Sequence, residues 1–184
     1  MEFADLNITD AGLAKFEKSL GFSQVHSLAR MVANNPKDLA RAGPEPSSLE
    51  SSNLDLLLAG IRLEQVILIN PFAAKGFERE PKLFRKIADE GKALEIPFSM
   101  FLNSFGAGRA GRFHVARKAI AMARKYKAPV VITSRASAEF ECKSPYEILA
   151  VAKSFLGMVD VEASGALSVN PTKIAEEFDL EPLG

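Results

Sequence analysis

The sequence has few of the residues that build disulfides and metal sites. It contains one cysteine (Cys142), two histidines (His26 and His114) and no tryptophan. A single cysteine excludes an internal disulfide framework and favours a reducing compartment. Zinc usually takes four ligands, so these three side chains cannot build a zinc site from soft ligands alone.

Long apolar runs are also missing. A membrane-spanning helix needs about 18 or more consecutive apolar residues, and the first residues lack the basic and apolar segments of a secretory signal. We therefore expect a soluble, cytoplasmic protein with no membrane partner. The 184 residues are 47% apolar and 25% charged, which is ordinary globular composition. This length predicts a single domain over residues 1–184.

Acidic residues are absent from one long stretch of the chain. Residues 96–138 contain eight Lys and Arg and no Asp or Glu, and residues 75–127 contain 13 basic against five acidic residues. The whole chain has a formal net charge of +0, so the remainder is acidic. This segregation of charge points to a polyanionic partner.

Apolar patterning predicts an α/β fold. Residues 65–69 and 129–133 are continuous apolar runs, typical of strands buried on both faces, and residues 93–102 predict a strand ending at Asn103. Helices are expected at residues 54–59, 81–90, 111–127, 144–156 and 170–178. The alternation predicts a parallel sheet with helices outside it, and ligand-binding residues at the carboxyl ends of the strands. Residues 34–52, rich in Pro, Gly, Asn and Ser, predict a loop.

The helix expected at residues 112–127 has a basic face. At 100° per residue, Val115, Ala119, Met122 and Tyr126 lie on one side, and the opposite side carries His114, Arg117, Lys118, Arg124 and Lys125. No acidic residue is placed at i±4 to offset the repulsion between these cations. The face is either a phosphate-binding surface or a solvated outer face of the fold.

Residues 106–111 match the pattern G-x-G-x-x-G. This pattern binds dinucleotides when it follows a strand directly and opens a helix, but the expected acidic residue further on is absent. A flexible basic loop that carries Arg109 and Arg112 toward a phosphate is the preferred interpretation.

Hydroxyls and cations in residues 133–145 suggest either an anion site or helix capping. No catalytic arrangement is evident, and we expect Cys142 to be a buried, inert thiol.

Several segments, taken in order and spacing, resemble archaeal ribonuclease P protein component 3. They are residues 130–134, 143–147, 156–158, 166–168 and 170–174, with weaker likeness at 123–127, 69–71 and 3–7. The resemblance implies a TIM-barrel-like β/α fold without the metal cluster of the related polymerase-and-histidinol-phosphatase domains. The short stretch 25–54 holds at most one βαβ unit of roughly 30 residues, so the barrel is expected to be incomplete or open in its N-terminal part.

The resemblance also implies a function. Members of that family are protein subunits of ribonuclease P, which removes the 5′ leader from precursor tRNA. There the RNA subunit performs the chemistry with magnesium, so this chain is expected to be non-catalytic by itself and to bind no cofactor. The implied partners are ribonuclease P RNA, another protein subunit and, indirectly, precursor tRNA.

The family pattern places RNA-facing cations near strand ends and before the basic helix. The expected RNA-binding residues are Lys75, Arg79, Arg109, Arg112, Arg117, Lys118, Arg135 and Lys143.

Two other hypotheses remain open from the sequence. One is a small β/α enzyme for a phosphorylated metabolite, with residues 106–111 as its phosphate cradle. The other is an interaction protein whose basic face contacts an acidic protein.

Overall fold

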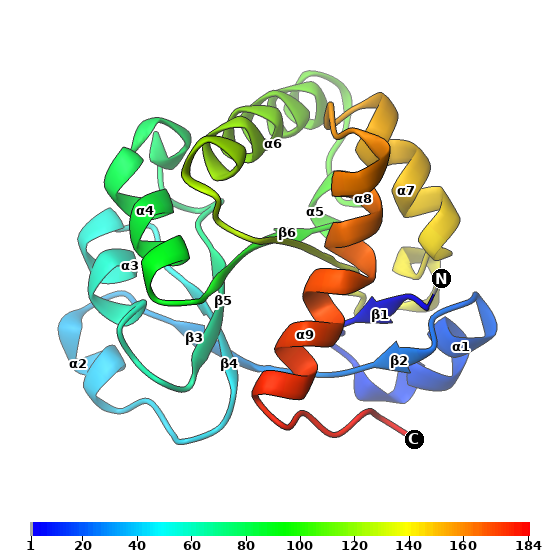
Figure 1. Ribbon diagram of the computed structural model, residues 1–184, viewed down its shortest axis with the longest axis horizontal. Helices are drawn as coiled ribbons and strands as arrows, with labels where there is room; N and C mark the ends of the chain where they lie inside the picture. Colours follow the sequence, from blue (N-terminus) through cyan, green and yellow to red (C-terminus); the bar gives the residue numbers. More distant parts are fainter. Residues whose placement is uncertain (1) are drawn as a thin grey trace. The chain divides into compact units, whose positions relative to one another are not determined.

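Strands and helices alternate along the chain in the computed structural model, which describes residues 2–184 (Figure 1). The strands are β1 (Ala4–Asp5), β2 (Gln24–Val25), β3 (Ala29–Val32), β4 (Ser47–Glu50), β5 (Val66–Asn70), β6 (Ala93–Pro97) and β7 (Val130–Thr133). The α-helices are α1 (Ala14–Ser19), α2 (Pro36–Ala40), α3 (Leu54–Gly60), α4 (Pro81–Asp89), α5 (Ser99–Leu102), α6 (Gly106–Tyr126), α7 (Pro145–Ser154), α8 (Asp160–Leu167) and α9 (Val169–Glu177).

The strands form two sheets. One pairs β1 with β2, and the other runs in the order β3-β4-β5-β6-β7. The pairs β1–β2, β3–β4, β4–β5 and β5–β6 are all parallel, and every residue of β5, β6 and β7 is buried. Strands buried on both faces explain the continuous apolar runs of the sequence. A complete TIM barrel has eight strands, whereas residues 2–184 contain seven, two of them only two residues long.

Contacts divide the chain into two compact units. The first comprises residues 1–27, 96–117 and 131–184, and the second comprises residues 28–95 and 118–130. In the second unit, α2, α3 and α4 lie along one side of β3, β4 and β5 (Figure 1). Gly60 ends α3 against β4, and a Cβ there would come within 2.5 Å of a Leu49 methyl group. Any larger residue at this position would force the Leu49 side chain to move.

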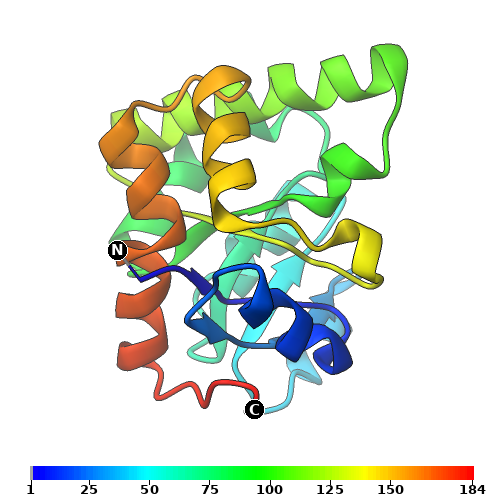
Figure 2. The same ribbon diagram turned by 90° about the vertical axis from the view of Figure 1, so that its right-hand side faces the viewer.

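In the first unit, the last three helices follow one another closely. Figure 2 shows α7 beside α8, with α9 continuing from α8. The buried residues Ala163, Ala166 and Leu167 let α8 pack tightly. The C-terminal segment is tied back by the N–H of Leu183, which donates to the carbonyl of Val25 at 2.7 Å, and by Lys18, which donates to the carbonyl of Leu183.

The loop expected at residues 34–52 is wrong, because this segment contains α2 and β4. Asn35 caps α2 through the N–H of Lys37, and Pro36 occupies the first turn, where a missing N–H costs nothing. Ser47 and Ser48 are polar yet buried in β4, since their hydroxyls bond to the carbonyl of Gln65 and to Glu95. The proline therefore begins a helix, and the two serines form hydrogen bonds that allow a polar strand to be buried.

Two other boundaries differ from the sequence prediction. The strand expected over residues 93–102 ends at Pro97, and the four residues of α5 follow it. Helix α8 was not predicted, because its sequence lacks an amphipathic pattern. Helices α3, α4, α7 and α9 lie within a few residues of their predicted positions, whereas α6 begins at Gly106 instead of Gly111. No helix among residues 2–184 combines the length and apolarity needed to cross a membrane.

The first turn of α7 offers a test of the fold. Ser144 accepts the N–H of Glu147, and the Glu147 carboxylate accepts from the N–H and hydroxyl of Ser144. We expect Ser144→Ala to lower the free energy of unfolding by about 0.5–2 kcal/mol, because it removes this cap. Urea unfolding would measure the loss. Ser52→Ala, at an exposed serine, is the control, and an equal effect of both variants would contradict the role of the cap.

Candidate nucleic-acid interface

Helix α6 has one face that packs and one that does not. Ala116, Ala119, Ile120 and Ala123 are buried, at the i, i+3, i+4, i+7 spacing of a helix face that contacts a core. Three of these four side chains are alanine, so the helix backbone packs closely. The long cationic side chains must then lie on the other side of the helix.

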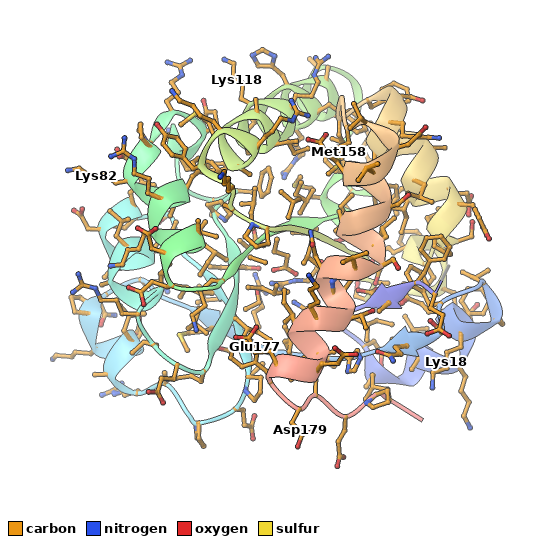
Figure 3. The ribbon with its side chains drawn as sticks, in the orientation of Figure 1. Lys18, Lys82, Lys118, Met158, Glu177 and Asp179 are labelled. Atoms are coloured by element: carbon orange, nitrogen blue, oxygen red, sulfur yellow. The ribbon has the colours of Figure 1, made fainter. Side chains whose placement is uncertain are left out.

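That other side carries the predicted basic face. His114, Arg117, Arg124 and Lys125 are exposed and Lys118 is half-buried. Arg112 is also exposed, but it lies four residues before Ala116 and thus in line with the packed face. Figure 3 shows Lys118 extending away from α6. Among the residues that the structure describes, Arg112, Arg117 and Lys118 form no ion pair. Their positive charges are therefore available to an external anion.

The Gly-rich segment is not a loop. Residues 106–111 form the first turns of α6, which begins at Gly106 with φ of 51°. Helix α5 also separates the segment from β6. The flexible-loop interpretation is therefore wrong. The dinucleotide fingerprint is wrong as well, because it needs a tight turn directly between a strand and a helix. The glycines instead leave the surface of the first turns open, since a Cβ at Gly106, Gly108 or Gly111 would meet nothing within 4 Å.

A pocket lies between the start of α6 and the end of α7, within the first unit. Its volume is about 360 Å³, and Gly106, Arg109, Phe113, Arg117 and Phe155 contribute to its lining. The ring of Phe113 stacks on Phe101 and on Phe155, with centroids 4.4 and 5.2 Å apart. The pocket thus combines two guanidinium groups with aromatic rings.

Phe155 is held by the way α7 ends. Its N–H and that of Leu156 both donate to the carbonyl of Val151, and Met158 donates to Ala152. Gly157 has φ of 70°, the left-handed conformation that commonly closes a helix. The ring is therefore positioned by backbone geometry, although 55% of the residue surface remains exposed.

The other predicted cations have local partners to different degrees. Arg79 contacts Glu78 at 3.4 Å, and Lys75 is exposed in the segment after β5. Lys143 donates to the carbonyls of Phe140 and Cys142 at 2.7 and 3.3 Å. Arg135 is half-buried with φ of 48°, and its N–H donates to the carbonyl of Asn7. Of the eight candidates, five lie in the first unit, and Lys75, Arg79 and Lys118 lie in the second.

Sequence reasoning missed Phe113 and Phe155. A signal existed for the first: Arg109, Phe113 and Arg117 are spaced by four residues each, which places them on one face of a helix. The helix was expected to begin only at Gly111, so Arg109 was not assigned to it. Nothing in the sequence predicts that Phe155, which lies 42 positions after Phe113 in the printed sequence, stacks on it.

Buried carboxyl groups form a second polar cluster in the first unit. Asp5 accepts the N–H groups of Asn7 and Ser134 at 3.0 and 3.1 Å. Glu17 is fully buried, and neither of its carboxyl oxygens has a hydrogen-bond partner among residues 2–184. Burial, with the nearby Asp5 charge, raises the pKa of Glu17 to about 9. Across the described residues, no group of His, Cys, Asp and Glu is arranged to hold a metal ion.

Cys142 adjoins this cluster and is buried, as expected. Burial and the neighbouring Glu17 raise the pKa of its thiol to about 12, so the reactive thiolate is scarce near neutral pH. We expect iodoacetamide to leave Cys142 unmodified in the folded protein at about pH 8 and to alkylate it fully after unfolding in guanidinium. Mass spectrometry would measure both, and rapid alkylation of the folded protein would contradict the assignment.

Glu17 gives the protein a specific dependence on pH. Its pKa rises from 4.5 to about 9 on folding, so the native state holds more protons than the unfolded state between these values. The free energy of unfolding should therefore fall as pH rises through this window, by at most about 1.4 kcal/mol per pH unit for one proton.

The substitution Glu17→Gln removes this proton exchange. We expect the variant to lose that part of the pH dependence and to be more stable than the original protein at about pH 8, as measured by urea unfolding from about pH 5 to 8. Glu176→Gln, at an exposed carboxyl on α9, is the control. Parallel stability profiles for Glu17→Gln and the original protein would contradict the assignment.

Comparisons with known proteins agree on one family. The profile of RNase P subunit p30 matches residues 49–180. Three proteins named Ribonuclease P protein component 3 are similar in sequence. That of Methanococcoides burtonii is 31% identical over 84% of this chain and 61% of its own length. That of Methanothermobacter thermautotrophicus is 27% identical over 79% and 62%, and that of Methanosarcina acetivorans 34% over 83% and 60%.

A solved structure shares the fold of this chain. A chain in a cryo-EM structure of archaeal ribonuclease P with mature tRNA superposes with a TM-score of 0.72 at 20% identity, covering 96% of this chain and 80% of that one. The expected TIM-barrel-like β/α fold is thus confirmed. The chain spans about three fifths of the length of the curated relatives it matches. The profile match and the relative at 31% identity show that this chain belongs to the RNase P subunit p30 family.

Proposed function

We propose that this chain is a protein subunit of ribonuclease P, the ribonucleoprotein that removes the 5′ leader from precursor tRNA. It assists the catalytic RNA by binding and steadying it, while the RNA performs the chemistry with magnesium. Its partners are ribonuclease P RNA and another protein subunit, and it meets precursor tRNA indirectly. Family membership over residues 49–180 is the observation that carries the proposal.

The charges of α6 support a direct contact with RNA. Residues 96–138 contain no carboxylate, and Arg112, Arg117 and Lys118 form no ion pair within the described chain. Cations that neutralise phosphates release condensed counterions, and this release drives association. An RNA backbone would supply the negative charge that the helix itself lacks.

The eight predicted cations do not contribute equally to this interface. Arg112, Arg117 and Lys118 lie on α6 without a carboxylate partner, whereas Arg79 is paired with Glu78 and the Lys143 ammonium is bonded to two carbonyls. We assign the main phosphate contacts to the α6 cations. Lys75, Arg79, Arg109, Arg135 and Lys143 complete the proposed set. The single free cysteine supports a cytoplasmic place of action, since that compartment keeps thiols reduced.

The combined variant Arg112→Gln, Arg117→Gln, Lys118→Gln tests this function. Filter binding to ribonuclease P RNA, with the partner subunit present, should show weaker affinity and a shallower salt dependence. Three lost phosphate contacts lower the slope of log K against log salt by roughly 2–3 in magnitude. In the reconstituted enzyme, the original chain should lower the magnesium needed for leader removal, and the variant should do so less.

A matched control removes three charges elsewhere. Lys15→Gln, Lys37→Gln, Lys173→Gln changes the net charge by the same amount at exposed positions outside α6. It should bind RNA with the salt slope of the original chain. Equal slopes for all three proteins would exclude α6 as the phosphate-binding face. A failure of the original chain to bind the RNA or affect leader removal would overturn the proposed function itself.

A further inference from the structure

We propose that the pocket between α6 and α7 binds one unstacked nucleotide of a single-stranded RNA segment. The base would stack on the exposed ring of Phe155, and Arg109 and Arg117 would hold the adjoining phosphates. This inference rests on the proposed RNA-binding function and identifies the kind of RNA structure that this site recognises.

The aromatic rings form a ladder from the core to the surface. Phe101 is 2% exposed, and its ring is almost parallel to Phe113, with an interplanar angle of 5°. Phe113 stacks in turn on Phe155 at 28°, and Phe155 is the exposed end of the series. A planar base would add a fourth member to this stack. Stacking of single-stranded bases on aromatic side chains is a common mode of RNA recognition.

Charge surrounds the aromatic stack on the same helix. Arg109 and Arg117 lie one turn before and one turn after Phe113, so the three share a face of α6. The side chain of Arg109 is anchored, since its Nε donates to the carbonyl of Ser104 at 2.6 Å, and its remaining N–H groups keep further donor capacity. Arg117 forms no ion pair within residues 2–184. A cation thus flanks the ring on each side along the helix.

The electrostatics favour an anionic occupant. No carboxylate lines the pocket, and the first turn of α6 contains no acidic residue. The N–H groups of that turn have no partner within the helix and add partial positive charge. An uncharged occupant would leave two guanidinium groups without counter-charge, whereas a nucleotide supplies a planar ring and a phosphate together.

The geometry also selects a single strand over a duplex. A volume of about 360 Å³ is in the range of small-molecule sites and suits one nucleotide rather than a helix. In a duplex the faces of each base are covered by neighbouring bases, so none is free to stack on Phe155. An unpaired base at a loop or a strand end can enter the pocket.

Two fluorescent oligonucleotides separate stacking from phosphate binding. One is a single-stranded RNA hexamer, and the other is an abasic ribose-phosphate hexamer of equal length. Fluorescence anisotropy with the full chain gives a Kd for each, and the ratio reports the contribution of the bases. We expect the RNA hexamer to bind about 5- to 150-fold more tightly, the range of one base–aromatic stack.

Variants of the chain then test whether the ratio of the two Kd values depends on the ring of Phe155. Phe155→Leu should bring the ratio close to one while leaving the Kd of the abasic hexamer unchanged, and Phe155→Tyr should keep the original ratio. Arg117→Gln should weaken both oligonucleotides by a similar factor. Phe16→Leu, at a partly exposed phenylalanine of α1, is the matched control and should keep the ratio. Thermal melting followed by circular dichroism confirms that each variant is folded.

The outcomes distinguish this inference from the function on which it rests. If Phe155→Leu keeps the original ratio while both oligonucleotides bind in a salt-dependent manner, the nucleotide pocket is wrong and the RNA-binding function stands. If Phe155→Leu instead weakens only the association with the partner subunit, the ring belongs to a protein interface, and the inference is again overturned. If neither oligonucleotide nor ribonuclease P RNA binds, both proposals fail.

Discussion

The close packing of α6 through small side chains constrains the whole basic surface. Ala116, Ala119 and Ala123 are buried, so the backbone of the helix lies against the core and its long cationic side chains must lie in water. Because residues 96–138 contain no carboxylate, neighbouring positions of this helix cannot neutralise them. A dense row of like charges is tolerated on an exposed surface because water and salt screen it.

One helix carries the features on which both proposals rest. The cations that we assign to phosphate, Arg112, Arg117 and Lys118, lie in the first half and middle of α6, and phosphate contacts of this kind carry no base-sequence information. At its N-terminal end, Phe113 joins a stack that reaches from buried Phe101 to exposed Phe155. The backbone hydrogen bonds that end α7 hold Phe155 next to Phe113. Preorganisation of this kind lowers the entropic cost of binding.

The buried cluster around Asp5 and Glu17 has a different physical basis. Asp5 accepts hydrogen bonds from two backbone N–H groups. Glu17 has no such donors among residues 2–184, and burial favours its neutral form. We therefore expect the cluster to act on stability and its pH dependence. Burial and the neighbouring Glu17 also raise the pKa of the Cys142 thiol.

Much of the structure was accessible from the sequence where the signal was local. Asn53 caps α3, and Ser144 with Pro145 begins α7; such signals act within a few residues of the helix start. Buried strands are visible in the sequence as apolar runs. Residues 34–52 and 106–111 were misjudged because Pro and Gly are compatible with both loops and helix ends. The same residue types begin α2 and α6 once neighbouring elements supply packing.

The sequence by itself determined the alternation of strands and helices, the segregation of charge and the basic face of α6, since each depends on residue order along one element. Only the tertiary structure decided that Phe101, Phe113 and Phe155 stack, that Glu17 is buried beside Asp5 and Cys142, and which cations lack a carboxylate. These contacts join residues from separate elements, and their energies depend on distance and burial in three dimensions. The periodicity of the sequence does not report the distance between two elements or the burial of their contacts.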